Sequence, residues 1–387
     1  MVSRRQLLVT GGASLLLIGG GVSGYALTRS AAKAREPWAQ AGQSFGDPRL
    51  DALAYALLAP NPHNRQPWQV RLEGTDSFEL FCDLDKRLPH TDPPNRQITI
   101  GFGTFLELFR QAAAEKGFRA DITPFPKGEA YPVLDERPLA RVKLSEDQKV
   151  VVDPLFGTVL ERRSTKEPFG SRPVDDESFA RLHAMAMGNR ADGRISLETS
   201  SEADRAAVFR DLTWKAWEVE YFTPRTQRES VDLMRIGASE INASPDGIDL
   251  DGPMMEAMYL GGIISRDQLA EKGSTAYETG ISIYRDMLAN THSFGWLSSQ
   301  GNSRSEQLAT GMAWVRINQA ATALGIAMHP VSQILQEFPE MEKLYDALHE
   351  QVEIAIPARV QGLFRFGYAE RPAPSPRWPL ESLIIDV

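Results

Sequence analysis

The stretch Asn64-Arg65-Gln66-Pro67-Trp68 and, about a hundred residues later, the stretch Arg162-Arg163-Ser164-Thr165-Lys166 carry most of the information in this chain. The second stretch places three cationic side chains and two hydroxyl groups within five residues. Guanidinium groups bind phosphate oxygens through paired hydrogen bonds, and hydroxyl groups fill the remaining positions. The first stretch is a proline-braced loop with amide side chains that suit the polar edge of a flat ring. Together they predict a site for a phosphorylated aromatic cofactor, built from two parts of the chain.

Composition narrows the function classes. The 387 residues are 42% apolar, which is enough for one large or two medium domains. The formal net charge of -9 disfavours a nucleic-acid partner. The single cysteine, Cys82, rules out an internal disulfide, and its apolar neighbours predict a small core residue. The six histidines show no metal-ligand spacing and no Gly-x-Ser-x-Gly motif occurs, so we predict neither a metal site nor a serine nucleophile.

The first 34 residues have the character of an export signal. Ser3-Arg4-Arg5-Gln6-Leu7-Leu8 is an arginine pair followed by apolar residues, and the uncharged residues 6–28 contain six glycines. This pattern is typical of a twin-arginine signal. Ala32-Lys33-Ala34 has the small residues of a cleavage site. We expect export to the periplasm by the twin-arginine machinery, either with cleavage after Ala34 or with a membrane tether through residues 7–28. An ordinary secretory signal is the alternative.

The rest of the chain reads as alternating helices and strands. Residues 35–46 predict a linker, and Ser145 with Gln148 predicts a capped helix over 145–163 that Pro154 interrupts. Periodicity predicts further helices over 101–116 and 305–324, and alternation predicts strands over 68–72, 78–82 and 359–368. Residues 225–300 are rich in Met, Gly and aromatic residues, which predicts either a lid or buried packing.

Four motifs resemble the nitroreductase superfamily. The segment 60–68 resembles its flavin-ring loop, and 162–166, with Phe169 and a helix capped by Asp175, resembles its phosphate-binding start. Gly325-Ile326-Ala327-Met328-His329-Pro330-Val331-Ser332-Gln333 resembles its loop beside the flavin N5, although typical members carry Gly in place of Gln333. Arg365-Phe366-Gly367-Tyr368 with the segment 375–380 resembles its C-terminal strand and basic tail. The resemblance covers most of residues 48–387.

The order of these motifs differs from the typical one. In most members of the superfamily the Arg-Ser-Lys stretch precedes the Pro-Trp loop in one short subunit, and the flavin lies between two identical subunits. Here the loop comes first, and the segment 187–192 lacks a second Pro-Trp. The layout resembles the Acg-like branch, with two α/β units fused into an intrachain pseudo-dimer. The resemblance therefore implies an α+β fold with mixed or antiparallel central sheets flanked by helices, an N-terminal unit over 47–144 and a C-terminal unit over 145–387.

The resemblance also implies one complete FMN site. Arg162, Arg163, Ser164 and Arg377 are expected at the phosphate, and Lys166 near the flavin N1, where an ammonium stabilises the charge of the reduced ring. The loop residues Pro60, Asn61, Pro62 and Asn64 are expected at the ring edge and ribityl chain. The backbone N–H of Ser332 is the candidate donor to N5. No protein acid, base or nucleophile is required, because the flavin carries the chemistry.

Three functions fit the sequence. The first is an exported FMN-dependent oxidoreductase that passes electrons from a small-molecule donor to a nitro- or quinone-type acceptor. The second is a protein that sequesters flavin without turnover, which the export signal favours because nicotinamide nucleotides are largely cytoplasmic. The third is a scaffold that has lost its cofactor. The visible spectrum of the purified protein separates the third from the first two.

Overall fold

The computed structural model describes residues 29–188 and 193–385, and these form an α+β fold with two four-stranded sheets. The twin-arginine motif and residues 7–28 lie outside the described residues. The first sheet has the order β1-β2-β4-β3, and all its neighbouring pairs are antiparallel. Its strands are β1 (Trp68–Glu73), β2 (Ser77–Cys82), β3 (Phe118–Pro124) and β4 (Ala140–Glu146). Cys82 is a buried residue of β2, as the sequence predicted.

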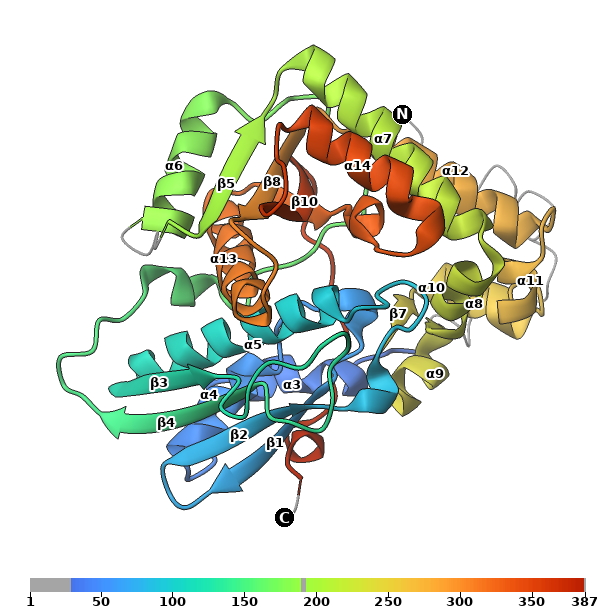
Figure 1. Ribbon diagram of the computed structural model, residues 1–387. Helices are drawn as coiled ribbons and strands as arrows, with labels where there is room; N and C mark the ends of the chain where they lie inside the picture. Colours follow the sequence, from blue (N-terminus) through green and yellow to red (C-terminus); the bar gives the residue numbers. More distant parts are fainter. Residues whose placement is uncertain (1–28, 189–192, 386–387) are drawn as a thin grey trace.

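The second sheet has the order β5-β8-β10-β9 and is also antiparallel. Its strands are β5 (Ile195–Ser200), β8 (Ser293–Ser299), β9 (Ala327–Pro330) and β10 (Arg359–Gly367). In Figure 1 the first sheet lies at the bottom and the second at the top. Two long helices, α5 (Arg96–Glu115) and α13 (Arg304–Ala323), run between them. The predicted α+β class and the two-unit organisation are confirmed.

The two sheets belong to units with the same succession of elements. In the first unit α4 (Pro48–Ala56) precedes β1 and β2, and α5 separates them from β3 and β4. In the second unit α6 (Asp176–Met187) precedes β5 and β8, and α13 separates them from β9 and β10. The strand orders correspond one to one. The common pattern α-β-β-α-β-β makes the molecule a pseudo-dimer within one chain.

The central helices touch through their backbones. A methyl group on Gly103 would lie 2.8 Å from the Gly311 Cα and collide with the Leu308 carbonyl oxygen. A methyl group on Gly311 would lie 2.7 Å from the Gly103 Cα and collide with the Ile100 carbonyl oxygen. Only glycine permits such an approach, because it has no Cβ. The crossing of α5 and α13 is therefore fixed by one glycine from each unit.

The same reciprocity extends along both helices. The side-chain amides of Gln111 and Gln319, 208 residues apart, donate to one another at 3.0 and 2.8 Å. Arg304, 1% exposed, donates to the carbonyl oxygens of Pro94, Ala130 and Pro132 in the first unit. Arg96, also 1% exposed, reaches the other way, to three residues near the second sheet: Leu335, Glu337 and Gln361. Each unit thus fastens its central helix to the other unit with one buried arginine.

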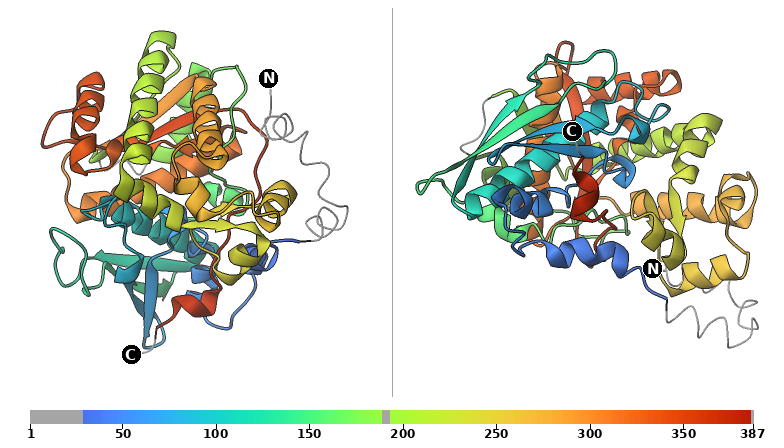
Figure 2. Two further views of the ribbon diagram at one scale, coloured as in Figure 1. Left: turned by 90° about the vertical axis from the view of Figure 1, so that its right-hand side faces the viewer. Right: turned by 90° about the horizontal axis from the view of Figure 1, so that it is seen from below.

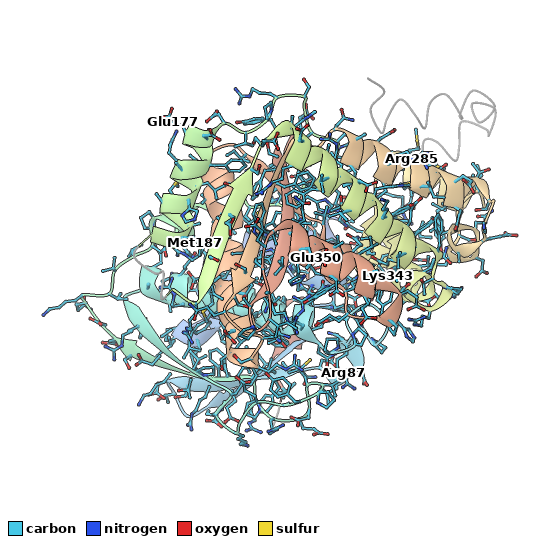
Figure 3. The ribbon with its side chains drawn as sticks, turned by 45° about the horizontal axis from the view of Figure 1, so that its top comes forward. Arg87, Glu177, Met187, Arg285, Lys343 and Glu350 are labelled. Atoms are coloured by element: carbon cyan, nitrogen blue, oxygen red, sulfur yellow. The ribbon has the colours of Figure 1, made fainter. Side chains whose placement is uncertain are left out.

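The second unit carries a helical insertion between β5 and β8. It comprises α7 (Ala203–Phe222), α8 (Pro224–Asp232), β6 (Met234–Ile236), α9 (Gly237–Ala243), β7 (Ile248–Leu250), α10 (Pro253–Leu260), α11 (Arg266–Ala270) and α12 (Thr275–Ala289). Strands β6 and β7 pair in parallel. Near the second sheet lie η6 (Ser332–Leu335), η7 (Pro339–Met341) and α14 (Glu342–Gln351). In Figure 3 Lys343 and Glu350 mark α14, and Arg285 marks α12.

The two ends of the described chain meet. Residues 33–35 form the short helix η1 (Lys33–Arg35), which continues into α3 (Glu36–Gln40). The side chains of Arg35 and Trp38 donate to the carbonyl oxygens of Pro374 and Ser375. Figure 2 shows this arm, in blue, near the C-terminal segment in red, which ends at η8 (Leu380–Leu383). We call residues 29–41 the N-terminal arm; its first half was expected to be signal and its second half linker, but the arm is folded onto the tail.

The expected helix over 145–163 was wrong. Ser145 and Glu146 pair with Arg119 and Phe118 as the end of β4. Within residues 147–163 the only helical turn is the 3₁₀ helix η4 (Pro154–Thr158), which Pro154 begins. Sheet pairing therefore overrides the capping pattern at Ser145. The expected helices over 101–116 and 305–324 are confirmed as α5 and α13, the latter with a capping box at Ser303 and Glu306. Among the described residues, no helix has both the length and the apolar character needed to cross a bilayer.

Candidate functional site

One cavity of about 440 Å³ lies at the seam between the two units. All ten residues that the sequence predicted as cofactor ligands line it: Pro60, Asn61, Pro62, Asn64, Arg162, Arg163, Ser164, Lys166, Ser332 and Arg377. The first unit, the start of the second unit and the C-terminal tail thus meet at one place. Their service as cofactor ligands stays a prediction, but the shared cavity that this prediction requires is present. Its volume falls in the range of small-molecule sites.

The first wall of the cavity is the loop between α4 and β1. Its backbone is left-handed at His63, Asn64 and Gln66, with φ of 47°, 51° and 50°. Three such residues without glycine are uncommon, and strain of this kind gathers at binding sites. The Asn61 side chain holds the turn by accepting from the Gln66 backbone N–H at 2.7 Å. The loop rests on α5, where the Thr104 hydroxyl donates to the Pro60 carbonyl oxygen at 2.7 Å.

Gln66 and Trp68 hold the loop in place, but through different partners. Gln66 is 2% exposed; its amide donates to the Pro245 carbonyl oxygen and accepts from the Trp378 backbone N–H. Gln66 therefore ties the loop to the insertion and the tail. Trp68 is buried against Phe102 and Phe105. Trp68 therefore anchors the end of the loop in the hydrophobic core of the first unit.

Three arginines form the most polar part of the cavity. Arg162 and Arg377 are 3% and 2% exposed, and both donate to the Leu58 carbonyl oxygen, at 2.9 and 3.0 Å. The Asn64 side-chain oxygen accepts from Arg377 at 2.6 Å. Arg163 is half-buried and donates to the Leu160 and Arg162 carbonyl oxygens. We call Arg162, Arg163 and Arg377 the arginine cluster.

Among the described residues, no carboxylate forms a salt bridge with the arginine cluster. Burial, and next the charges of Arg377 and Arg163, lower the pKa of Arg162 to about 9. Burial likewise lowers the pKa of Arg377 to about 9, only partly offset by Asp249. The Nε atoms of all three guanidinium groups are buried without a hydrogen-bond partner among the described residues. Buried, mutually repelling cations with orphaned donors are the setting that an incoming phosphate dianion would satisfy.

The remaining cavity residues are mostly neutral at physiological pH. Burial, and next the charge of Lys166, lower the pKa of His63 to about 4. Burial and the adjacent Arg365 also hold the pKa of His329 well below its usual value, and its Nδ1 accepts from the Arg365 Nε at 3.0 Å. Lys166 is exposed at the cavity. Ser332 is the first residue of η6, where a backbone N–H has no partner within its own helix.

The structure adds cavity residues that sequence reasoning missed. Trp38 of the N-terminal arm lies over Arg163 and Arg377, with ring-to-guanidinium distances of 4.6 and 5.6 Å. The insertion contributes Glu220 and residues 247–250, and α5 contributes Gln97. No sequence signal linked Trp38 or Glu220 to the motifs, because they are distant from them along the chain. The methionines and aromatic residues of 251–300 do not line the cavity.

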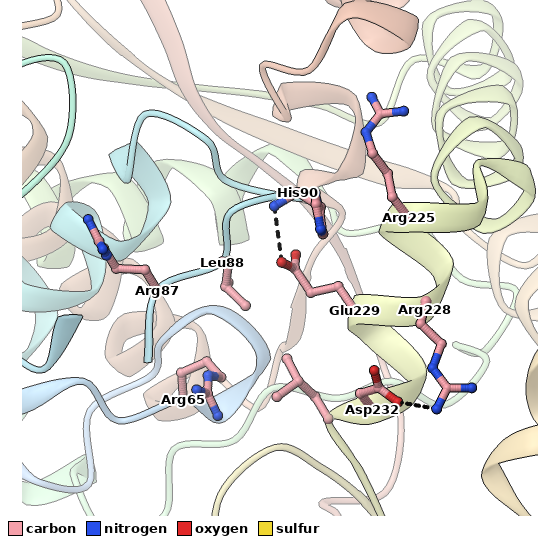
Figure 4. A pocket seen from close by; sticks show the side chains of 9 residues that line it. Arg65, Arg87, Leu88, His90, Arg225, Arg228, Glu229 and Asp232 are labelled. Atoms are coloured by element: carbon pink, nitrogen blue, oxygen red, sulfur yellow. Dashed lines mark hydrogen bonds and ion pairs between the residues drawn. The ribbon is translucent and has the colours of Figure 1, made fainter. Parts of the chain in front are cut away.

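A second, more open cavity of about 360 Å³ lies between α8 and the first unit. Figure 4 shows Arg65, Arg87, Arg225 and Arg228 around it. Each of these cations already has an acceptor, as Arg228 has Asp232 and Arg225 has Glu340. Glu229 accepts from the backbone N–H groups of His90 and Thr91 and so fastens α8 to the first unit. This cavity is explained by packing between the insertion and the first unit.

Comparison with known proteins finds similar proteins that are named as putative nitroreductases. The chain is 27% identical over 343 residues to "Putative NAD(P)H nitroreductase Rv3131" of Mycobacterium tuberculosis, covering 86% of this chain and 89% of the relative. The chain is therefore similar, over most of its length, to a protein named as a putative nitroreductase. It is also 25% identical over 351 residues to "Putative NAD(P)H nitroreductase acg" of the same species, covering 86% of this chain and 93% of that relative. No protein-family model matches the chain.

Solved structures give weaker likenesses. The FMN- and NADPH-dependent nitroreductase NfnB from sphigopyxis sp. strain HMH superposes with a TM-score of 0.38 at 15% identity. The superposition covers 60% of this chain and 98% of the solved structure. The FMN-dependent NfnB from Mycobacterium smegmatis, in complex with NADPH, gives 0.37 at 16% identity and covers 57% of this chain and 92% of that structure.

Proposed function

We propose that this protein is an FMN-dependent oxidoreductase of the nitroreductase type. It would take electrons from a small-molecule donor and pass them to nitro- or quinone-type acceptors. The observation that carries the proposal is the arginine cluster, whose three buried or half-buried guanidinium groups face one cavity with orphaned Nε atoms. The nitroreductase-like relatives and the FMN-dependent neighbours support the choice of cofactor.

Residues of this chain fit the parts of FMN. The arginine cluster and Ser164 would hold the phosphate, and the strained loop Pro60–Asn64 would hold the ring edge and ribityl chain. Lys166 would place positive charge near the ring, and the first N–H of η6, at Ser332, would donate to it. Bound FMN would supply the hydride and electron chemistry. Among the described residues, no group of three or more His, Cys, Asp or Glu side chains is placed to hold a metal ion.

The visible absorption spectrum tests the proposal. The purified protein should be yellow, or should become yellow on addition of FMN and retain it through gel filtration. Arg162→Ala with Arg163→Ala should release FMN, because the phosphate would lose two charge-assisted contacts. Arg119→Ala with Arg141→Ala, at two exposed arginines of the first sheet, is the matched control and should retain it. A colourless protein that rejects FMN contradicts the proposal.

Turnover separates the enzyme from a flavin-storage protein. Anaerobic addition of NADPH should bleach the bound flavin, and a nitro- or quinone-type acceptor should restore the colour. Bleaching by dithionite alone would favour storage or a donor other than a nicotinamide nucleotide. The storage alternative is plausible for an exported protein, because nicotinamide nucleotides are largely cytoplasmic. The additions of NADPH and of dithionite test it directly.

We further propose export by the twin-arginine route with the signal retained as a tether. The support is the N-terminal arm. Ala34 is 3% exposed, its N–H donates to the Asn242 side chain at 3.0 Å, and its carbonyl oxygen accepts from the Arg377 N–H at 2.8 Å. Twin-arginine substrates fold before export. The peptide bond after Ala34 would therefore already be packed against the folded protein when a signal peptidase reached it. N-terminal sequencing of the protein from periplasmic and membrane fractions tests the proposal, and an N-terminus at Arg35 would contradict retention.

A further inference from the structure

A buried acid lies in the same cavity as the arginine cluster. Glu220, near the end of α7, is 8% exposed and lines the cavity. Its two carboxyl oxygens accept from the Ser230 hydroxyl at 3.0 Å and from the Gln336 amide at 3.1 Å. None of the interactions found for the described residues pairs it with a lysine or arginine. A buried carboxyl with neutral partners only is costly to ionise.

The surroundings of Glu220 favour its neutral form. Burial raises its pKa to about 7, and the Glu229 carboxylate on α8 adds to the shift, while the hydrogen bonds from Ser230, Gln336 and Gln333 oppose it. On α12 the Tyr284 phenol faces the same group; burial and the charge of Glu220 raise the pKa of Tyr284, so it stays protonated. Near neutral pH the Glu220 carboxyl therefore exists both with and without its proton.

Two amides that line the same cavity as Glu220 have unused hydrogen-bonding atoms. Gln336 is 5% exposed and lines the cavity, and its Oε1 is buried without a partner among the described residues. Gln97, in the first turn of α5, also lines the cavity, and its Nε2 is buried without a partner. Buried polar atoms that stay unpaired are rare, and in a cavity they point to a ligand with complementary groups. We call Glu220, Gln97 and Gln336 the amide recess.

We propose that the amide recess is the acceptor subsite, and that Glu220 selects neutral acceptors by donating a hydrogen bond from its protonated carboxyl to a nitro or carbonyl oxygen. This inference rests on the proposed function. Gln97 supplies a second donor to the same class of oxygen atoms. Gln336 keeps the Glu220 carboxyl in place, because the Gln336 side chain donates a hydrogen bond to it and the Gln336 backbone caps the C-terminal end of η6. Loss of the Glu220 proton removes the donor and leaves a carboxylate that repels oxygen lone pairs.

Binding of 4-nitrobenzamide to the oxidised, FMN-loaded protein tests the inference without turnover. The dissociation constant is measured from the change in flavin absorbance, well below and well above pH 7. Wild-type protein should bind tightly on the acid side and about tenfold or more weakly on the alkaline side, a ratio typical of a lost hydrogen bond in a buried site. Glu220→Gln should bind tightly at both pH values, since its amide N–H₂ replaces the acid O–H. Glu218→Gln, on the same helix but outside the cavity, should behave as wild type.

Two further measurements distinguish failure of the acceptor subsite from failure of the proposed FMN-dependent function. Infrared difference spectra should show a protonated carboxyl band in wild type that shifts on 4-nitrobenzamide binding and is absent in Glu220→Gln. If Glu220→Gln does not fold, Gln97→Leu should still weaken binding several-fold on the acid side. A protein that retains FMN but binds 4-nitrobenzamide equally on both sides of pH 7 overturns the subsite and leaves the proposed function standing. A protein that does not retain FMN overturns both.

Discussion

The two units of the chain share one plan, yet they contribute different things to the cavity. The first unit is the bare α-β-β-α-β-β motif, and it gives a short strained loop, Pro60–Pro67. The second unit has an insertion of about ninety residues between its first two strands, and this insertion brings Glu220 and residues 247–250 to the cavity. A pair of identical subunits would make two equal sites. Fusion into one chain allowed one unit to specialise in holding the other unit's loop and in covering the site.

The seam between the units has stayed nearly symmetric while the cavity has not. Gly103 faces Gly311, Gln111 faces Gln319, and Arg96 and Arg304 each reach into the opposite unit. At the seam, the backbones of α5 and α13 approach each other closely from both sides. Each helix therefore needs the same kind of residue at the crossing. The cavity binds a ligand that itself has no symmetry, so its two halves need not match.

The strongest test of this comparison is the glycine crossing. Gly311→Ala should abolish stable folding, with a loss of more than about 4 kcal/mol in the free energy of unfolding, because its methyl group would meet backbone atoms that cannot move aside. Gly103→Ala should be equally damaging if the seam is symmetric. Urea unfolding followed by circular dichroism measures both. Gly157→Ala, where an added methyl group meets nothing within 4 Å, should change little.

The reciprocal arginines should give the next largest effect. Arg304→Met strips a donor from buried carbonyl oxygens of the first unit, and Arg96→Met does the same to the second unit. We expect each to lower the free energy of unfolding by about 3 kcal/mol, since buried partners are left unsatisfied. Equal losses would support the symmetric seam. A loss confined to one arginine, measured by the same urea titration, would show that one unit alone holds the pair together.

Trp38 tests the asymmetric part, because the N-terminal arm covers an arginine cluster drawn from the second unit and the tail. Trp38→Ala should weaken FMN binding by about three- to tenfold, the size of a lost cation–π contact, and leave the fold intact. Trp38→Phe should retain most of the affinity. Flavin fluorescence titration gives both constants, and unchanged binding in Trp38→Ala would remove the arm from the site.

The smallest effect concerns pH and the first unit's loop. His63 has a pKa of about 4 in the folded protein and about 6.5 when unfolded, so as pH falls from 6.5 towards 4 the unfolded chain takes up a proton that the folded chain refuses. Stability should therefore decline over this window, and less steeply in His63→Gln. His292→Gln, outside the cavity, serves as the control. Identical slopes of unfolding free energy against pH in His63→Gln and wild type would contradict a His63 that stays neutral in the folded protein.

Local patterns in the sequence predicted the long helices and the ligand candidates well. The capping box at Ser303 and the apolar stripe behind it define α13, and no later contact competes with them. Ser145 has a similar capping pattern but lies in β4, because pairing with Arg119 of β3 satisfies its backbone within the first sheet. The arm was mistaken for a linker because Trp38 finds its partners far along the chain, at Arg163, Ser375 and Arg377.

The residues alone determined which groups can bind a phosphate and which can form a tight loop, because charge, hydrogen-bonding capacity and proline are properties of the side chains themselves. Only the tertiary structure decided that ten such residues line one cavity, that two glycines set the distance between the units, and that Glu220 is deprived of a cation. These depend on contacts between segments that are far apart in the chain, where closure of long loops and burial from water determine the outcome.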